Sequence, residues 1–257
     1  MCSSDVIHAA SSGAAVGDAI PLAEPVTRPL RHVQDLTHTL TPDFPTFPFY
    51  KPFRADTLAT VEAQGFAARE LRFAEHVGTH LDAPAHFFAD GATAEHLSPA
   101  ALVAPLVVVS IAERVARDED TTLSVDDLRA WERLHGRIPA GAVVALHSGW
   151  ESRLAEPGRY LNSDALGVMH APGFSAEAAE FLVRERGMAG AATDTLSLDF
   201  GPSVGYEAHN VILGAGRYGL ENVANLGRVP PSGATIFVGA PKHLGATGGP
   251  ARLLALF

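Results

Sequence analysis

Three histidines and one aspartate lie close together in the segment EHVGTHLDAPAHFF, residues 75–88. They are His76, His80, Asp82 and His86, separated by four, two and four residues. Imidazole nitrogens and carboxylate oxygens are donors that suit Zn²⁺ or Mn²⁺. His80 and Asp82 would point to the same side of an extended chain, because side chains alternate along a strand. Gly78 permits a bend, so that His76 can reach the same ion.

The last histidine of this segment suggests a second role. Pro84 removes a backbone donor and argues against a regular strand continuing past it. His86 then follows the three candidate ligands, close enough to act on whatever a metal holds. The alternative is a histidine-rich loop whose imidazoles only form hydrogen bonds in the core. The readiness of imidazole to bind metals favours the metal site.

The composition predicts a folded protein that binds neither nucleic acid nor membranes. The 257-residue chain is 47% apolar and 19% charged, with a mean hydropathy of +0.11. The net charge of −10 disfavours nucleic acid and anionic membrane surfaces, which are bound through excess Lys and Arg. No apolar run approaches the length of a membrane span. The single cysteine, Cys2, allows no internal disulfide and is compatible with a cytoplasmic location.

Residues 1–29 are rich in Ala, Ser and Gly and carry no Lys or Arg before Arg28. They lack the basic region and the continuous apolar core of a secretory signal. We expect a flexible tail here, with the remnant of a longer processed leader as the alternative. Residues 30–257 show no internal repeat and no linker, and we therefore expect one domain.

Apolar segments of strand length alternate with segments that carry helix-start signals. Strands are expected within residues 33–40, 54–63, 67–74, 105–111, 142–146, 235–240 and 250–256. Helices are expected to start at Ser98, to cover residues 124–134 with Ser124 as N-cap, and to cover residues 175–186. This alternation predicts an α/β fold with a parallel or mixed sheet flanked by helices. The early hairpin and the late strands predict that part of it is barrel-like.

A proline-rich loop at residues 41–50, TPDFPTFPFY, places aromatic side chains between three prolines. Phe44, Phe47, Phe49 and Tyr50 have two possible roles. Aromatic residues usually pack in a core, but proline-rich loops seldom lie wholly inside one. These side chains are therefore candidates either for the core or for the wall of a pocket that takes a planar substrate.

His209 and Glu221 are candidates for a second half of the site. The glycines between them predict a loop, after which LENVANL is expected to form a short helical turn carrying Glu221. Each has an ordinary alternative, a loop histidine and a glutamate on a solvated helix face. Beside a three-donor metal loop, however, they could hold a second ion or support the first.

The chain resembles the metal-dependent hydrolase family often called the cyclase family, which includes bacterial kynurenine formamidases and isatin hydrolases. The segment HVGTHLDAPAH, residues 76–86, matches its signature H-x-G-T-H-x-D-x-P-x-H at every fixed position. The resemblance extends from about residue 33 to residue 257, through DLTHTL, LHSGW, TDTLSLD, NVANL and PPSGATIFVGAP.

The resemblance implies an α/β sandwich with a mixed sheet, assembled as homodimers or homotetramers. It also implies two sets of ligands that share Asp82: His76, His80 and Asp82 for the first ion, and Asp82, His209 and Glu221 for the second. His86 would be the catalytic acid/base. Two departures affect these expectations. Formamidases tend to carry a tryptophan where this chain has Phe47, and isatin hydrolases use one manganese, so that one or two Zn or Mn ions are expected.

The implied reaction is hydrolysis of an amide C–N bond by water that a divalent ion activates. Such an ion polarises the carbonyl and lowers the pKa of bound water from about 15.7 towards about 7. The ions, together with Asp82 as their ligand, would hold the tetrahedral oxyanion, and His86 would protonate the leaving nitrogen. A serine hydrolase is disfavoured, because Ser148 and Ser197 lack the G-x-S-x-G context of a nucleophile elbow.

The first hypothesis for the substrate is an aryl formamide such as N-formylkynurenine, which belongs to tryptophan catabolism. A cyclic amide of the isatin type, or a lactone, is the alternative within the same chemistry. A module that binds a metal or small molecule without turnover is the alternative from another class. The presence of His86 beside a complete ligand set argues against it, because binding alone does not need that residue.

Overall fold

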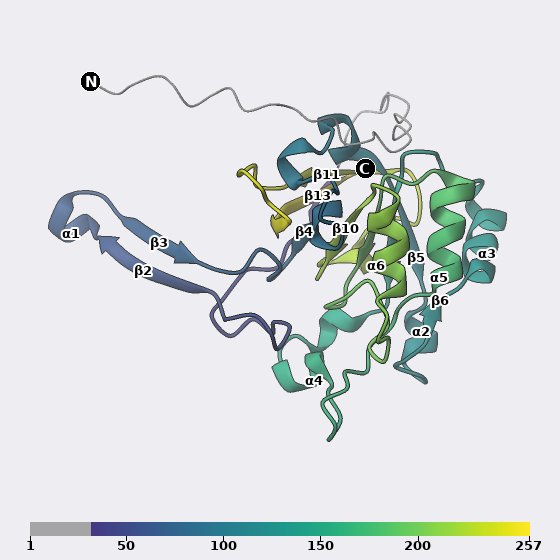
Figure 1. The fold of residues 1–257 in the computed structure, drawn as a ribbon, viewed down its shortest axis with the longest axis horizontal. Coiled ribbons are helices and arrows are strands. Elements are labelled where there is room, and N and C mark those ends of the chain that lie inside the picture. The colour runs from purple at the N-terminus through teal and green to yellow at the C-terminus, as the bar shows by residue number, and fades with distance from the viewer. Residues whose placement is uncertain (1–31) are drawn as a thin grey trace.

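Nine strands form one mixed sheet at the centre of the computed structural model, which describes residues 32–257 (Figure 1). The expected tail at residues 1–29 lies outside the described residues. From one edge of the sheet to the other, the strands are β1 (Val33–Asp35), β13 (Arg252–Leu256), β11 (Ala234–Gly239), β5 (Val103–Ser110), β7 (Val143–His147), β9 (Gly190–Thr193), β10 (Tyr218–Glu221), β4 (His80–Asp82) and β12 (Gly248–Pro250).

Four neighbouring strands in the middle of the sheet, β5, β7, β9 and β10, run parallel, and the strands outside them are antiparallel. Apolar side chains cover both faces of these strands, as expected for strands between two layers. On β5, Leu106 and Val108 belong to one buried cluster, whereas Val107 and Val109 belong to another. The predicted α/β class with a mixed sheet is confirmed.

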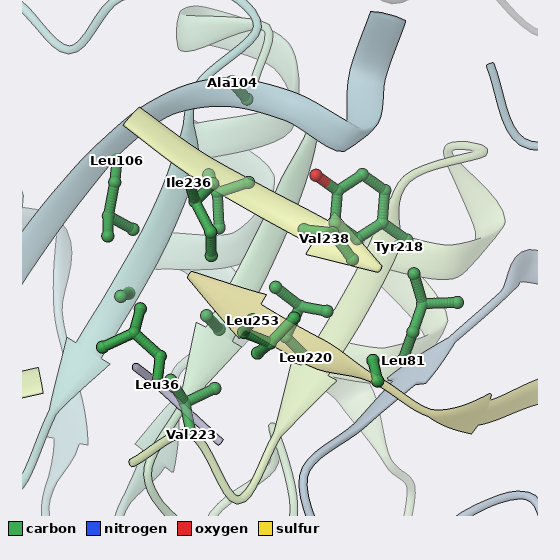
Figure 2. Close-up of a cluster of buried hydrophobic side chains, with 14 of the residues drawn as sticks. Leu36, Leu81, Ala104, Leu106, Tyr218, Leu220, Val223, Ile236, Val238 and Leu253 are labelled. Atoms are coloured by element: carbon green, nitrogen blue, oxygen red, sulfur yellow. The ribbon is translucent and has the colours of Figure 1, made fainter. Parts of the chain in front are cut away.

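The sheet curls around the first of these clusters (Figure 2). Ile236 of β11 and Leu253 of β13 lie in the same cluster as Leu81 of β4 and Leu220 of β10. Strands this far apart in the sheet order can share one core only if the sheet bends. The predicted barrel-like part is therefore confirmed, and it spans most of the sheet.

Helices cover the outer face of the sheet and pack on the second cluster. The α-helices of the body are α2 (Ala112–Val115), α3 (Val125–His135), α4 (Pro157–Leu161), α5 (Ala176–Glu180) and α6 (Glu207–Gly214). Helix α5 continues as one π-helical segment, Phe181–Arg186, and ends at Gly187, whose φ of 60° permits the stop. Short 3₁₀ turns lie at Pro84–His86, Ala94–His96, Pro99–Leu102, Trp150–Arg153 and Leu226–Arg228. The strands β6 (Thr122–Leu123) and β8 (Gly173–Phe174) form a small separate sheet.

Ser124 caps α3 as predicted. Its hydroxyl oxygen accepts from the Asp127 N–H at 3.2 Å, and the Asp127 carboxylate accepts from the Ser124 N–H at 2.8 Å. Arg114 donates two further hydrogen bonds to the Asp127 carboxylate, at 2.9 and 2.7 Å. The start of this helix is therefore fixed by two reciprocal bonds and an ion pair.

A two-stranded ribbon projects from the body (Figure 1). This arm consists of β2 (Arg54–Ala59), α1 (Val61–Gln64) and β3 (Ala68–Arg72). Ala55 and Leu71 are cross-strand partners on one face, and the rings of Phe53 and Phe73 lie 6.3 Å apart at its base. Leu71 is 54% exposed. The arm therefore carries apolar side chains that the rest of the described chain does not cover.

Two local expectations were wrong. The helix expected after Ser98 is only a 3₁₀ turn, and the Ser98 side chain makes no capping hydrogen bond. Glu221 lies on strand β10 and not on a helical turn, while His209 lies in helix α6. The backbone of β10 pairs with β9 and β4, so that tertiary pairing outweighs the local pattern. No helix within residues 32–257 is long and apolar enough to cross a membrane.

Candidate metal centre

Strands β4 and β10 carry the centre of the site. In their antiparallel pairing, Leu81 faces Leu220 and His80 faces Glu221. Leu81 and Leu220 point into the curled core (Figure 2). Because side chains alternate along a strand, His80 and Glu221, together with Asp82, lie on the opposite face. One register therefore separates the apolar core from the polar site.

The other site residues reach this face from neighbouring segments. His76 lies in the loop before β4, where Gly78 adopts a φ of 62° that the bend requires. His209 comes from the first turn of α6. Strand β4 ends before Pro84, which begins the 3₁₀ turn that carries His86. The predicted interruption of the strand at this proline is confirmed.

The structure brings the first predicted set of ligands together. His76 Nδ1 lies 2.6 Å and His80 Nε2 lies 3.2 Å from Asp82 Oδ1. All three residues are buried. Ligand atoms at about 2.0–2.2 Å from one Zn²⁺ are about 3–3.5 Å apart, so that these separations are close to those of a shared ion.

The second predicted set adjoins the first through Asp82. His209 Nε2 lies 3.1 Å from Glu221 Oε1 and 3.8 Å from Asp82 Oδ2, and Glu221 Oε2 lies 3.3 Å from His80 Nε2. Within each set, one ligand atom per residue can be chosen so that all lie within 4.8 Å of one another. The two carboxylate oxygens of Asp82 therefore face two different groups of donors.

Outer hydrogen bonds fix which ring nitrogen faces the centre. His80 Nδ1 donates to the Gly78 carbonyl at 2.9 Å, and His209 Nδ1 donates to Asp199 Oδ2 at 2.6 Å. The inner Nε2 atoms therefore present lone pairs in the neutral tautomers. His80 Nε2 and Asp82 Oδ2 are buried without a hydrogen-bond partner. Buried lone pairs facing one another need a positive charge between them.

The electrostatics of the site point the same way. Burial disfavours a charged His80, but Asp82 and Glu221 outweigh this effect and raise its pKa to about 10. Burial would also raise the pKa of Asp82, yet the neighbouring histidines hold it well below its usual range. The two buried carboxylates, Asp82 and Glu221, therefore favour a positive charge between them. The donor set, the two atoms without partners and this charge demand all fit a divalent cation.

His86 belongs to neither set of ligand atoms. Its ring stacks on that of His76, with centroids 3.7 Å apart and an interplanar angle of 23°. Burial lowers the pKa of His86 to about 4, although the nearby Asp82 carboxylate opposes this. The imidazole is therefore neutral at neutral pH.

A cavity of about 270 Å³ opens over the two ligand sets. Besides five of the six polar site residues, all except Asp82, it is lined by Phe47, Tyr50, Phe87, Leu196, Ser197 and Tyr206. Phe87 stacks on His209, with centroids 4.8 Å apart and an interplanar angle of 15°. The cavity is thus walled mainly by aromatic and apolar groups, with the polar donors gathered together.

The three phenylalanines predicted to bind substrate have different positions. Phe47 lines the cavity, whereas Phe44 is only 6% exposed and packs near the ring of His38. Phe49 is 84% exposed and lines a separate groove at the base of the arm. Phe87 and Tyr206 were not predicted. Their signal was their closeness in sequence to His86 and His209.

Asp194 and Asp199, both in the segment TDTLSLD, accept hydrogen bonds from backbone N–H groups. Asp194 accepts from the N–H groups of Ser148, Gly149 and Trp150. Asp199 accepts from two N–H groups at the start of α6 and also from the His209 ring. Asp199 therefore does more than hold a turn, because it orients a candidate ligand.

Comparison with known proteins places this geometry in a family. Residues 34–200 match the family described as putative cyclase. The chain is 32% identical over 242 residues to the isatin hydrolase of Roseibium aggregatum, covering 87% of this chain and 91% of that protein. Isatin hydrolase A from Ralstonia solanacearum has a similar structure, with a TM-score of 0.84 and 38% identity, covering 88% of this chain and 91% of that one.

An isatin hydrolase solved with the product analogue thioisatinate gives a TM-score of 0.83 at 30% identity and covers 88% of this chain and 92% of that one. These three relatives each match 87% or 88% of this chain. Together with the chemistry of the donors, they show that the chain belongs to the putative cyclase family and is a metal-dependent amide hydrolase.

Proposed function

We propose that the protein hydrolyses the ring amide of an isatin-type cyclic amide. The observation that carries this proposal is the similarity to isatin hydrolases, one of which was solved with thioisatinate as a product analogue. The aromatic walls of the cavity suit a flat, bicyclic substrate, and the ligand sets lie in the same cavity. The aryl formamide hypothesis uses the same chemistry, but the relatives favour the cyclic amide.

In this proposal, His76, His80 and Asp82 hold the first divalent ion, Zn²⁺ or Mn²⁺. Asp82, His209 and Glu221 are available for a second. A divalent ion held there would polarise a carbonyl and lower the pKa of water, so that hydroxide would be available for attack near neutral pH. Asp199 accepts a hydrogen bond from Nδ1 of His209, and the Gly78 carbonyl accepts one from Nδ1 of His80. The Nε2 atom of each ring is thereby left without a hydrogen and can bind the ion.

His86 is the acid/base group of the proposal. Its ring lies against His76 at the cavity, and as a neutral imidazole it accepts the proton that the attacking water loses. It then returns this proton to the ring nitrogen as the C–N bond breaks. The nitrogen leaves as an amine and the carbonyl carbon becomes a carboxylic acid, which releases its proton to solvent as a carboxylate. In a cyclic amide, both groups stay on one product.

The test compares two substrates on one preparation. Purified protein is stripped of metal, reloaded with Mn²⁺ or Zn²⁺, and mixed with isatin or with N-formylkynurenine, whose ring opening or deformylation changes the absorbance. We expect faster turnover of isatin, and no turnover of either without a metal. Faster turnover of the formamide would replace the proposed substrate, whereas turnover without any metal would contradict the mechanism.

The expected assembly into homodimers or homotetramers is part of the proposal. A two-stranded ribbon alone is marginally stable in water, yet the arm projects from the body with Leu71 and Leu58 mostly exposed. Apolar groups in such a position are commonly covered by another chain. A second copy of this chain would supply that cover.

A further inference from the structure

We propose that Glu75 and Thr247 are positioning residues that set the tautomer of His76 and so direct its Nδ1 atom to the metal. This inference rests on the proposed function in one respect, namely that a divalent ion occupies the first ligand set. It concerns residues outside that set. Glu75 precedes His76 in the chain, and Thr247 immediately precedes β12, far away in the sequence.

A chain of hydrogen bonds connects these residues. The Thr247 hydroxyl donates to Glu75 Oε2 at 2.5 Å, and His76 Nε2 lies 3.0 Å from the same hydroxyl oxygen. A carboxylate can only accept hydrogen bonds, and a hydroxyl has only one hydrogen to donate. Since that hydrogen goes to Glu75, the Thr247 oxygen can only accept from His76. The ring hydrogen of His76 is therefore on Nε2.

This assignment leaves a lone pair on Nδ1 of His76. Nδ1 faces Asp82 Oδ1 at 2.6 Å, within the first ligand set. His80 and His209 reach the same state through the Gly78 carbonyl and Asp199. All three histidines thus have an outer partner that accepts a ring N–H, but only for His76 does the contact run through a hydroxyl to a carboxylate.

The carboxylate and the ring are both held in place. Glu75 Oε1 lies 2.8 Å from His243 Nε2, and the Thr247 N–H contacts both carboxylate oxygens at 3.3 Å. A Cβ atom on Gly248 would lie 2.6 Å from His76 Cε1, so that the backbone after Thr247 closes on the ring. His86 stacks on the ring as well. His76 therefore has little freedom to turn, and its outer bond decides its tautomer.

The experiment measures metal affinity by competition with a chelator. Thr247→Val removes the hydroxyl and keeps the shape, and we expect it to weaken the binding of Zn²⁺ by about 10- to 100-fold. Thr247→Ser retains the hydroxyl and should bind close to wild type. Glu75→Gln should also weaken binding, because its amide can donate to the hydroxyl and reverse the chain. Ser110→Ala is the matched control, since it removes another hydroxyl–imidazole contact of 3.0 Å, to His147.

Nitrogen-15 spectra of the zinc-loaded wild-type protein test the tautomer directly. We expect the His76 ring hydrogen on Nε2; a hydrogen on Nδ1 would overturn the inference without any variant. Equal affinity in wild type, Thr247→Val and Glu75→Gln would also overturn it. If the wild-type protein binds no divalent ion at all, the proposed function fails instead, so that the two failures are distinct. Should Thr247→Val not fold, Glu75→Gln and the wild-type spectrum still decide.

Discussion

Asp82 is the residue that connects the two halves of the site. Its Oδ1 atom faces His76 and His80, and its Oδ2 atom faces His209. Glu221, by contrast, belongs only to the second set, although it also lies near His80. The two acids should therefore differ in what their loss removes.

We expect Asp82→Asn to lose all bound metal and Glu221→Gln to keep the first ion. An amide has no negative charge with which to balance a divalent cation, and only Asp82 contributes to both sets. Elemental analysis of the purified variants measures the metal per chain. Two ions in wild type and one in Glu221→Gln would support both sets. Equal metal in wild type and Glu221→Gln would contradict a second ion, and retention of metal by Asp82→Asn would contradict the first.

His86→Ala should lower turnover by about 100- to 10,000-fold while leaving metal content nearly unchanged. Its ring stacks on a ligand but belongs to neither ligand set. Turnover and elemental analysis together measure the effect. His80→Ala is the comparison that should lose metal, and the exposed His135→Ala is the control that should change neither. If His86→Ala lost metal as completely as His80→Ala, His86 would be a ligand.

At this scale, the sequence predicted the identity of the polar residues better than their surroundings. The sequence allowed the prediction of four site residues, because they lie within eleven consecutive positions and the bend between them is at Gly78. These residues are His76, His80, Asp82 and His86. Thr247 was not predicted, because only the pairing of β12 with β4 brings it to His76. The side chains that wall the cavity likewise come from separate loops.

Among the elements, those with strong local signals were predicted best. Helix α3 has its N-cap at Ser124, and the apolar run of β5 is a buried strand. Strand β10 was not predicted, because its segment YGLE is short and its partner strands β9 and β4 are distant in the sequence. A four-residue strand is specified by its partners more than by its own composition. The residue Glu221 was therefore identified while its element was not.

The start of α3 should make stability depend on pH. Burial would raise the pKa of Asp127, but the hydrogen bonds from Arg114 and Ser124 lower it below its ordinary value. A carboxyl with a lowered folded pKa stabilises the fold above its unfolded pKa, and this contribution is lost as the pH falls through the folded pKa. We expect Asp127→Asn to lower the free energy of unfolding by about 1 kcal/mol at pH 7.

The difference between wild type and Asp127→Asn should shrink as the pH falls below about 4. Denaturant unfolding at several pH values measures it. Asp126→Asn, in the same helical turn, is the matched control, because the bonds from Arg114 go to Asp127. A difference that stayed constant down to the lowest pH would contradict the assigned cause.

For the whole molecule, the arm makes the state of assembly testable. Leu71 is 54% exposed beside its cross-strand partner Ala55, and the arm projects from the body (Figure 1). We expect Leu71→Arg to shift a dimer or tetramer towards the monomer, because a charge would replace an apolar contact. Light scattering measures the mass. Leu134→Arg, at an 80% exposed leucine on α3, is the control. A monomeric wild type would contradict the proposed assembly.

The pairing of β12 with β4 has a consequence for how the enzyme is made. Residues near position 80 leave the ribosome before Glu221 and Thr247, the hydrogen-bonding partner of His76, have been synthesised. A nascent polypeptide thus exposes histidines that can meet metal before their final neighbours exist. Capture of the correct ion would then have to wait until these later residues have been synthesised, and an ion taken earlier would be held by an unfinished set of donors.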